Sequence, residues 1–226
     1  MTVVAAETAS EADRGPPPPK PLARAFFAQP VDVLAVACLG LRLVRRWPDG
    51  SLSVGSIVEV EAYGGPDDRA SHARSGRTAR NATMFGPAGH AYVYRVYGLH
   101  TCLNIVGAAS GDVGAVLVRA VAAEEGLSAV RARRDRPGRA PLAPVRLASG
   151  PGNVGQAFGI GLELDGVDLT LPDTLWLAAG ARPGPADIVR GPRIGVAYAG
   201  PDWADLPRRF GVRGHPALSR PFPRAG

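Results

Sequence analysis

The sequence predicts an α+β fold, in which one domain contains an antiparallel β-sheet with helices at its edges. Three observations lead to this class. The chain has 226 residues, 46% of them hydrophobic, which is enough for one core of ordinary size. Short strand-like runs in its first half are separated by turn sequences. The sequence shows no repeat, no heptad pattern and no strand–helix alternation of the parallel-sheet type.

The first elements are marked by turn residues. Residues 31–39 predict a short apolar helix that stops at Gly40. Residues 41–46 and 53–63 predict two strands, because each is rich in apolar residues and the turn sequence Trp-Pro-Asp-Gly at 47–50 separates them. These two strands are therefore expected to pair as a hairpin.

Residues 64–89 are rich in Gly, Arg, Asp and Ser and are expected to form a long loop. Loops of this length in a compact domain usually carry function or are disordered. The remaining expected elements are three strands, a helix followed by an Arg- and Pro-rich surface segment, a helix opened by a Ser-Gly-Pro-Gly turn, and three short strands. The first three strands cover residues 91–96, 103–106 and 115–120. The helix covers residues 122–134, and the surface segment covers 133–144. The second helix and its opening turn cover residues 149–160, and the three short strands cover 169–171, 174–177 and 193–196.

Residues 1–20 are polar and acidic before a run of four prolines, which predicts a disordered Pro-rich tail ahead of a domain at residues 21–226. The tail lacks the apolar segment of a secretory signal. No run approaches the roughly 20 apolar residues that a membrane span needs. We therefore expect a cytoplasmic protein that does not bind membranes, with Cys38 and Cys102 as buried thiols instead of a disulfide.

The net charge of +6 favours a polyanionic partner. A genome biased toward GC codons also produces a chain rich in Ala, Gly, Pro and Arg, so charge alone leaves nucleic-acid binding undecided. Lys20, in the Pro-rich tail, is the only lysine. Schiff-base chemistry needs a lysine amine in a desolvated site, so covalent catalysis by lysine is not expected.

The segment from Ile57 to Tyr63 carries a candidate site. If it is a strand, alternation sends its side chains to opposite faces: Val58, Val60 and Ala62 into the core, and Ile57, Glu59, Glu61 and Tyr63 to the other side. Glu61 and Tyr63 would then form a flat stacking surface beside a potential base, and His72 would supply a hydrogen bond. Taken alone, either glutamate is more simply explained as a solvated strand residue.

Tyr94 and Tyr97 lie three residues apart, so a regular strand sends them to opposite faces. Gly98 suggests that the strand ends there and leaves Tyr97 at an exposed tip. An aromatic side chain at the tip of a turn in a basic protein is a candidate wedge between base pairs. The simpler alternative is that both tyrosines belong to the core or to an edge strand.

Spacing excludes several common sites. The four histidines, at positions 72, 90, 100 and 215, show no metal-ligand spacing, and no Cys-x-x-Cys is present. The Gly-rich residues 150–155 lack the Lys-Ser/Thr pair of a phosphate loop. No metal site is therefore expected.

A series of short motifs resembles the alkyladenine (3-methylpurine) DNA glycosylase family. The resemblance runs from about residue 22 to 220, and its specificity lies in the order of a dozen matches. These are Glu61-Ala-Tyr63, Pro66-Asp-Asp, His72, Arg80-Asn81, Met84-Phe85, Tyr92-Val-Tyr94, Tyr97-Gly98, Cys102-Leu-Asn104, Val116-Leu-Val-Arg119, Ser149-Gly-Pro151, Arg193-Ile-Gly-Val196 and Arg213-Gly214.

The resemblance implies a curved antiparallel sheet flanked by helices, with a protruding β-hairpin that enters the DNA minor groove, in a fold like the formyltransferase C-terminal domain. It implies a monofunctional enzyme that flips alkylated purines, and as a secondary expectation deaminated purines, out of duplex DNA. A Glu-activated water then hydrolyses the N-glycosidic bond and initiates base excision repair. The implied enzyme is a monomer without cofactor or metal, associated with the bacterial nucleoid through DNA.

The family's site residues are carried over by position and fall into three groups. The catalytic group is Glu61 as general base, with Arg119 and the main-chain carbonyl of Ile194 positioning the water. The other groups are the base pocket and the intercalating residue: Tyr63, His72 and Tyr94 as walls, Asn104 as the floor that clashes with the guanine amine, and Tyr97 as the wedge.

Two alternatives remain open at this stage. One is a non-catalytic binder of distorted or damaged nucleic acid, although the Glu61 and Arg119 pair argues against it. The other is a glycosidase of free nucleosides, which would need no wedge. Gly64 and His100 depart from what animal relatives carry, which bears on lesion preference, and the role of residues 131–146 is undecided.

Overall fold

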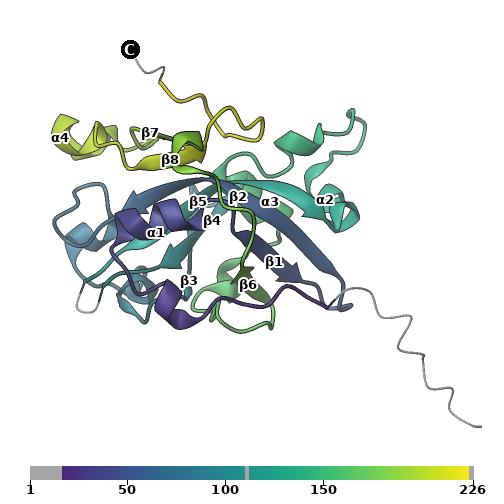
Figure 1. Ribbon diagram of the computed structural model, residues 1–226, viewed down its shortest axis with the longest axis horizontal. Helices are drawn as coiled ribbons and strands as arrows, with labels where there is room; N and C mark the ends of the chain where they lie inside the picture. The colour runs from purple at the N-terminus through teal and green to yellow at the C-terminus, as the bar shows by residue number, and fades with distance from the viewer. Residues whose placement is uncertain (1–16, 110–111, 224–226) are drawn as a thin grey trace, which may run out of the picture.

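An eight-stranded antiparallel sheet, curled into a half-barrel, organises the protein (Figure 1). The computed structural model describes residues 17–109 and 112–223, so most of the predicted tail lies outside the described residues. The strand order is β3-β4-β5-β2-β1-β6, and β8 pairs with β2 and β7. The strands are β1 (Arg42–Arg46), β2 (Leu52–Tyr63), β3 (Ala91–Val96), β4 (His100–Val106), β5 (Ala115–Glu125), β6 (Leu175–Ala178), β7 (Ile188–Gly191) and β8 (Arg209–Val212).

Four α-helices occur in the described residues: α1 (Val31–Cys38), α2 (Leu127–Arg134), α3 (Pro151–Ala157) and α4 (Pro201–Ala204). Helix α1 packs on β2, and α3 packs on β4 and β5. The predicted helix over residues 31–39 is confirmed, and Gly40, with a φ of +79°, allows the chain to turn directly into β1. The predicted α+β class is therefore confirmed.

Strand β2 lies in the middle of the sheet and holds both candidate glutamates. Its first half pairs with β1, which confirms the predicted hairpin, and its second half pairs with β8. Strand β5 runs along its other edge, with irregular register at residues 57–60. This bulge makes the predicted alternation wrong: Ile57 joins Val60 in the main core, whereas Val58 packs against Ala120 and Ala217.

The predicted helix over residues 122–134 is wrong in its first four residues. Strand β5 continues to Glu125, which is paired with Val54 of β2. Helix α2 begins only after Gly126, whose φ of +63° interrupts the strand. The hydrogen-bonded ladder with β2 therefore overrides the local helix preference of the Ala- and Glu-rich segment.

Two predicted short strands are also wrong. Residues 169–171 form a turn, because the Asp168 carboxylate accepts hydrogen bonds from the Thr170 N–H and hydroxyl. Residues 193–196 form a bend in which Gly195 has a φ of +79°, a conformation outside the β region. The strand that was predicted there lies earlier, at β7.

The hairpin of β3 and β4 ends in an exposed tip. Residues 97–99 connect the paired residues Val96 and His100, and Tyr97 and Gly98 have φ values of +50° and +70°, as the two central residues of a type I′ turn require. The side chains of Tyr97 and Leu99 are 91% and 81% exposed, in contrast to the buried strands behind them. The predicted exposure of Tyr97 at a strand end is therefore confirmed.

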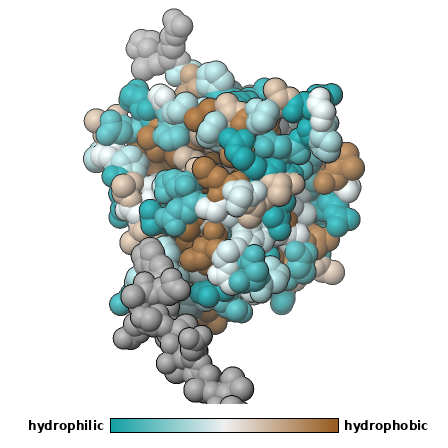
Figure 2. Space-filling view, turned by 90° about the vertical axis from the view of Figure 1, so that its right-hand side faces the viewer, coloured by the Kyte–Doolittle hydropathy of each residue, from teal (hydrophilic) through white to brown (hydrophobic). Residues whose placement is uncertain are grey.

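The arginine-rich segment after β5 largely serves the fold. Arg131 and Arg134 donate to the carbonyl oxygens of Leu142 and Leu147 at 3.1 and 2.6 Å, and the Arg133 guanidinium lies 3.7 Å from the centroid of the Trp47 ring. Arg131, Arg133 and Arg134 therefore have partners within the chain. Figure 2 shows the side of the molecule on which α2 lies in Figure 1, where hydrophobic residues form small groups among hydrophilic ones.

Both cysteines are buried and unpaired, as predicted. Burial raises the pKa of Cys38 to about 12 and that of Cys102 to about 11, so both thiols are protonated near neutral pH. Among the helices in the described ranges, none is long and apolar enough to cross a membrane.

Candidate active site

A cavity of about 220 Å³ opens between the β3–β4 hairpin, β2, β5 and the loop after β7. It brings together residues that are far apart in the sequence. Seven of the eight predicted site residues line it: Tyr63, His72, Tyr94, Tyr97, Asn104, Arg119 and Ile194. The eighth, Glu61, has no exposed surface and lies behind this lining.

Three rings form the aromatic side of the cavity. The ring centroids of His72 and Tyr94 are 4.5 Å apart at an interplanar angle of 70°, and those of Tyr92 and Tyr94 are 5.5 Å apart. His72 Nδ1 lies 2.8 Å from the Tyr92 hydroxyl oxygen, which holds the imidazole in place. Tyr92 belongs to one of the family motifs but had no predicted role, although its spacing from Tyr94 puts both on one strand face.

His72 is neutral near pH 7. Partial burial of its ring lowers its pKa, and the guanidinium groups of Arg80 and Arg74 lower it further. A neutral imidazole has one donor and one acceptor nitrogen. The side chain of His72 can therefore hold Tyr92 with one nitrogen and offer the other to a ligand in the cavity.

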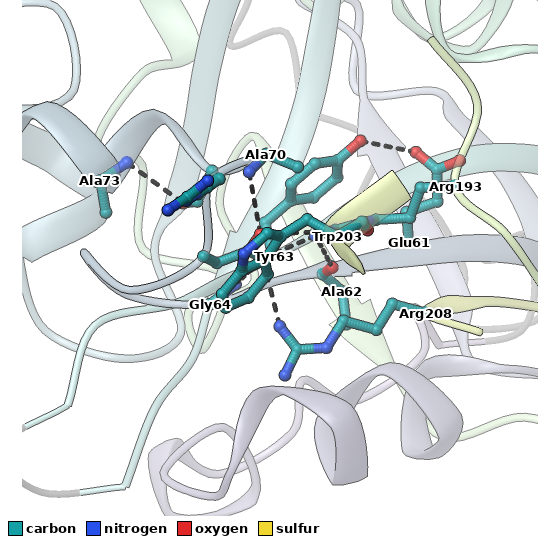
Figure 3. A network of polar contacts seen from close by, with 12 residues as sticks. Glu61, Ala62, Tyr63, Gly64, Ala70, Ala73, Arg193, Trp203 and Arg208 are labelled. Carbon is teal, nitrogen blue, oxygen red and sulfur yellow. Dashed lines mark hydrogen bonds and ion pairs between the residues drawn. The ribbon is translucent and has the colours of Figure 1, made fainter. Parts of the chain in front are cut away.

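The Glu61 carboxylate accepts two hydrogen bonds and forms one ion pair, all with groups that line the cavity. The Ile194 N–H donates to Oε1 at 2.7 Å, whereas the Tyr63 hydroxyl and Arg119 Nη1 approach Oε2 at 2.8 and 3.2 Å. Figure 3 shows the Tyr63 hydroxyl pointing at this carboxylate. A carboxylate offers about four acceptor positions. These three contacts therefore leave one acceptor position of the carboxylate unused.

Tyr63 acts as the hydrogen-bond donor in this contact. Burial raises the pKa of its phenol well above the usual value, and the charge of Glu61 raises it further. The hydroxyl consequently stays protonated near neutral pH. Tyr63 thus contributes a ring to the cavity wall and a proton donor to the carboxylate behind it.

Arg119 is shared by two buried carboxylates. Its Nη1 contacts Glu61, and its Nε donates to Glu59 Oε1 at 3.0 Å. Burial opposes the charge of Arg119, but the carboxylates of Glu61 and Glu59 raise its pKa above the usual value. The interpretation of Glu59 and Glu61 as solvated strand residues is wrong, since both are completely buried. Sequence reasoning gave Glu59 no role.

A second buried ion pair lies behind Tyr63. The two Nη atoms of the Arg193 guanidinium donate to the Asp68 carboxylate at 2.6 and 3.0 Å. Arg193 also donates to the carbonyl oxygens of Ala62 and Trp203. Its guanidinium carbon lies 4.9 Å from the centroid of the Tyr63 ring, and this network is drawn in Figure 3. The pair fixes the loop that contributes Ile194, and sequence reasoning had not identified it.

Asn104 and Tyr97 occupy opposite parts of the cavity. Asn104 is buried on β4, where its Nδ2 donates to the Tyr92 carbonyl oxygen at 3.1 Å. Tyr97 lines the rim and is largely exposed. The site is thus an aromatic slot with an amide inside, an exposed tyrosine at its rim and a hydrogen-bonded carboxylate behind its wall.

Such a slot suits chemistry on a planar, electron-poor ring. Aromatic faces attract cations and stack on flat ligands. A carboxylate beside a sugar can stabilise oxocarbenium-like charge and deprotonate water. The arrangement can therefore support hydrolysis of a bond between a heterocyclic base and a sugar.

Comparisons with known proteins agree with this chemistry. Residues 25–216 match the model of a family described as methylpurine-DNA glycosylase. The chain is 44% identical over 200 residues to the human DNA-3-methyladenine glycosylase, covering 86% of this chain and 66% of the human protein. It is 45% identical over 203 residues to a provisionally named 3-methyladenine DNA glycosylase of Rhodopseudomonas palustris, covering 89% and 92% of the two chains.

Proposed function

The chain belongs to the methylpurine-DNA glycosylase family, a group of DNA-repair hydrolases that act on N-glycosidic bonds, and from this premise we propose how it works. The enzyme flips an alkylated purine out of duplex DNA and hydrolyses its N-glycosidic bond with a water activated by Glu61. The observation that carries this proposal is the buried Glu61 carboxylate, which three lining groups hold and which keeps one acceptor position open.

In the proposed reaction the extruded base stacks between Tyr63 on one side and His72 and Tyr94 on the other. The bond from C1′ to the base breaks, the base leaves with the bonding electron pair, and positive charge develops on the sugar. Glu61 stabilises this charge and takes a proton from water while the water oxygen bonds to C1′. The DNA strand keeps an intact abasic site, since Lys20 is the only lysine and is not among the residues that line the cavity.

Arg119 and Ile194 orient the reacting groups. The contacts of Ile194 N–H with Oε1 and of Arg119 Nη1 with Oε2 hold the carboxylate in one plane. We assign the water to the remaining acceptor position, with the main-chain carbonyl of Ile194 as its second partner. Because the Tyr63 hydroxyl also occupies Oε2, stacking of the substrate on the Tyr63 ring would couple base binding to the position of the carboxylate.

Asn104 would select among bases. Its buried amide is held by the Tyr92 carbonyl oxygen, so it has little freedom to make room for a larger purine edge. A guanine amine that meets it would clash or leave buried polar groups unpaired, which lowers binding. Alkylated purines, whose weakened glycosidic bond and electron-poor ring favour release, are the proposed main substrates, and deaminated purines are a second class.

Tyr97 is proposed to fill the gap that the extruded nucleotide leaves. Tyr97→Ala should lower the rate of base release at subsaturating DNA roughly ten- to hundredfold, because stacking of one aromatic ring on a base contributes about 1–3 kcal/mol. Stability should not change, since the side chain is 91% exposed. The measurement is single-turnover base release over a range of enzyme concentrations.

Leu171→Ala is the matched control for this variant, because Leu171 is also exposed but is not part of the cavity. It should release base at the wild-type rate. Equal rates for Tyr97→Ala and wild type at every enzyme concentration would contradict the wedge role.

The proposed function is tested by incubating the wild-type protein with methylated duplex DNA in EDTA. Chromatography should detect free 3-methyladenine or 7-methylguanine, and the DNA strand should break only after alkali treatment. Tight binding without base release would favour the non-catalytic binder instead. Release from free nucleosides at a comparable rate would favour a nucleoside glycosidase, because that reaction needs no duplex.

A further inference from the structure

Glu59 is a buried carboxylate that the proposed reaction does not use. It has no exposed surface and lies two residues before Glu61 on β2. Four groups bind it: Arg119 Nε at 3.0 Å, Arg209 Nη1 at 3.1 Å, and the Ser219 N–H and hydroxyl at 2.5 and 2.8 Å. All four partners donate to the carboxylate, so its acceptor positions are fully used.

These side chains form a row of alternating charge: Glu61, Arg119, Glu59 and Arg209. All four residues are buried. Arg119 meets Glu59 through Nε and Glu61 through Nη1, so the two carboxylates bind different edges of one planar guanidinium. Because the guanidinium is a rigid fork, holding Nε fixes the direction of Nη1.

The C-terminal segment, residues 215–222, completes this row. Ser219 donates to Glu59 and accepts from Arg119 Nη2 at 3.2 Å. The segment is held in place by the Ser149 hydroxyl, which donates to the Leu218 carbonyl oxygen, and by Phe222, whose ring centroid is 3.8 Å from the Arg209 guanidinium. In Figure 1 it appears in yellow beside β8, on the side of the sheet where β7 and α4 lie.

We propose that Glu59 is a positioning residue that divides the charge of Arg119 between two carboxylates and thereby limits how far Arg119 weakens Glu61 as a base. This inference rests on the proposed role of Glu61. If Arg119 contacted Glu61 alone, its whole positive charge would stabilise the Glu61 anion and weaken its attraction for a proton. Glu59 draws part of that charge away while holding Arg119 in place.

The direction in which Glu59 changes the strength of Glu61 as a base depends on every charged or titratable group around Glu61. The guanidinium of Arg119 is the positive charge nearest to the Glu61 carboxylate. Glu59 offsets the influence of this charge on Glu61, because it contacts the same guanidinium. The other groups around the carboxylate are neutral or farther away: the phenols of Tyr63 and Tyr94, the thiol of Cys102, and the guanidiniums of Arg193 and Arg209.

Two single variants test the proposal because they should shift the pH profile of single-turnover base release in opposite directions. Glu59→Gln should move the acidic limb of this profile, where the rate rises with pH, about one pH unit lower and reduce the maximal rate roughly tenfold. The reason is that the positive charge of Arg119 then acts on Glu61 without the negative charge of Glu59 to offset it. Arg209→Gln should move the limb to higher pH, because Glu59 then offsets Arg119 more strongly.

Arg134→Gln is the control for a general loss of stability. Arg134 donates to the Leu147 carbonyl oxygen at 2.6 Å and does not line the cavity, so this variant should keep the wild-type profile. If Glu59→Gln does not fold, the charge-balanced double variant Glu59→Gln/Arg209→Gln replaces it. The expected shift is again to lower pH, since Arg119 still loses the carboxylate that it contacts directly.

Rate losses without movement of the acidic limb, or movement in the same direction for both single variants, would overturn the proposal and leave Glu59 a purely structural role. This failure is distinct from failure of the proposed function. Absence of base release by the wild-type protein refutes the reaction itself, whereas active wild type with unshifted variants refutes only the role of Glu59.

Discussion

Glu61→Gln should reduce single-turnover base release by about two to four orders of magnitude, the usual contribution of a general base. The amide has the shape of the carboxylate, and its oxygen can still accept from the Ile194 N–H. It cannot take a proton from water, and it places an N–H₂ group near Tyr63 or Arg119 instead of an acceptor. Base release from methylated duplex DNA measures the loss.

The matched control is Glu124→Gln, a change of the same chemistry near the other end of the sheet. Glu124 lies on β5 and accepts from Ser56 on the exposed end of β2, so its replacement should leave base release unchanged. Affinity for damaged duplex should be kept in both variants. Retention of more than a tenth of the wild-type rate by Glu61→Gln would show that another group activates the water.

Asp68→Asn should lower the free energy of unfolding by about 3–5 kcal/mol, because it leaves a buried charge without its partner. The carboxylate binds Arg193 through both oxygens, accepts from Arg208 Nη1 at 3.2 Å, and takes the N–H groups of Gly64 and Ala70. An asparagine has one acceptor oxygen for these five donors. Urea unfolding at pH 7 should show a lower midpoint with an unchanged slope.

The free energy of unfolding that Asp68→Asn loses should depend on pH. Burial raises the pKa of Asp68, but the bonds from Arg193 and from backbone N–H groups outweigh this and hold the pKa below its usual value. A group whose pKa is depressed by folding stabilises the protein above its unfolded pKa, about 3.9 for Asp, and loses that contribution as pH falls through the folded value. The wild-type and Asp68→Asn stabilities should therefore converge as the pH falls below about 4.

Asp135→Asn serves as the comparison for this prediction. Asp135 pairs with Arg131 across one helical turn, and both side chains are about one-third exposed. Its loss should lower the urea midpoint far less than the loss of Asp68 does, because solvent screens an exposed ion pair. Equal costs for the two variants would mean that the Asp68–Arg193 pair is not the structural support that we infer.

Local chemistry explains why much of the architecture could be predicted. The helix after Pro30, the β1–β2 hairpin and the exposed Tyr97 all depend on residues within one turn of one another, so their turn and capping residues specify them. The aromatic and amide positions of the cavity were predicted from family motifs, and the structure places seven of the eight proposed site residues around one cavity.

Long-range pairing explains the errors. Residues 122–125 have a helical composition but are strand, because β2 offers them a ladder. The bulge at residues 57–60 depends on how β2 meets β5 and β8, and so does the face on which Ile57 lies. Neither feature has a signal within the segment concerned.

Sequence patterns alone predicted the fold class, the family, the exposed position of Tyr97 and Glu61 as the candidate base. Only the tertiary structure decided what surrounds that base. Glu59 finds partners 60, 150 and 160 residues away, and Arg193 finds Asp68 at a separation of 125. Both carboxylates are buried because folding brings donors to them from several distant segments at once, since desolvation of an unpaired carboxylate is too costly.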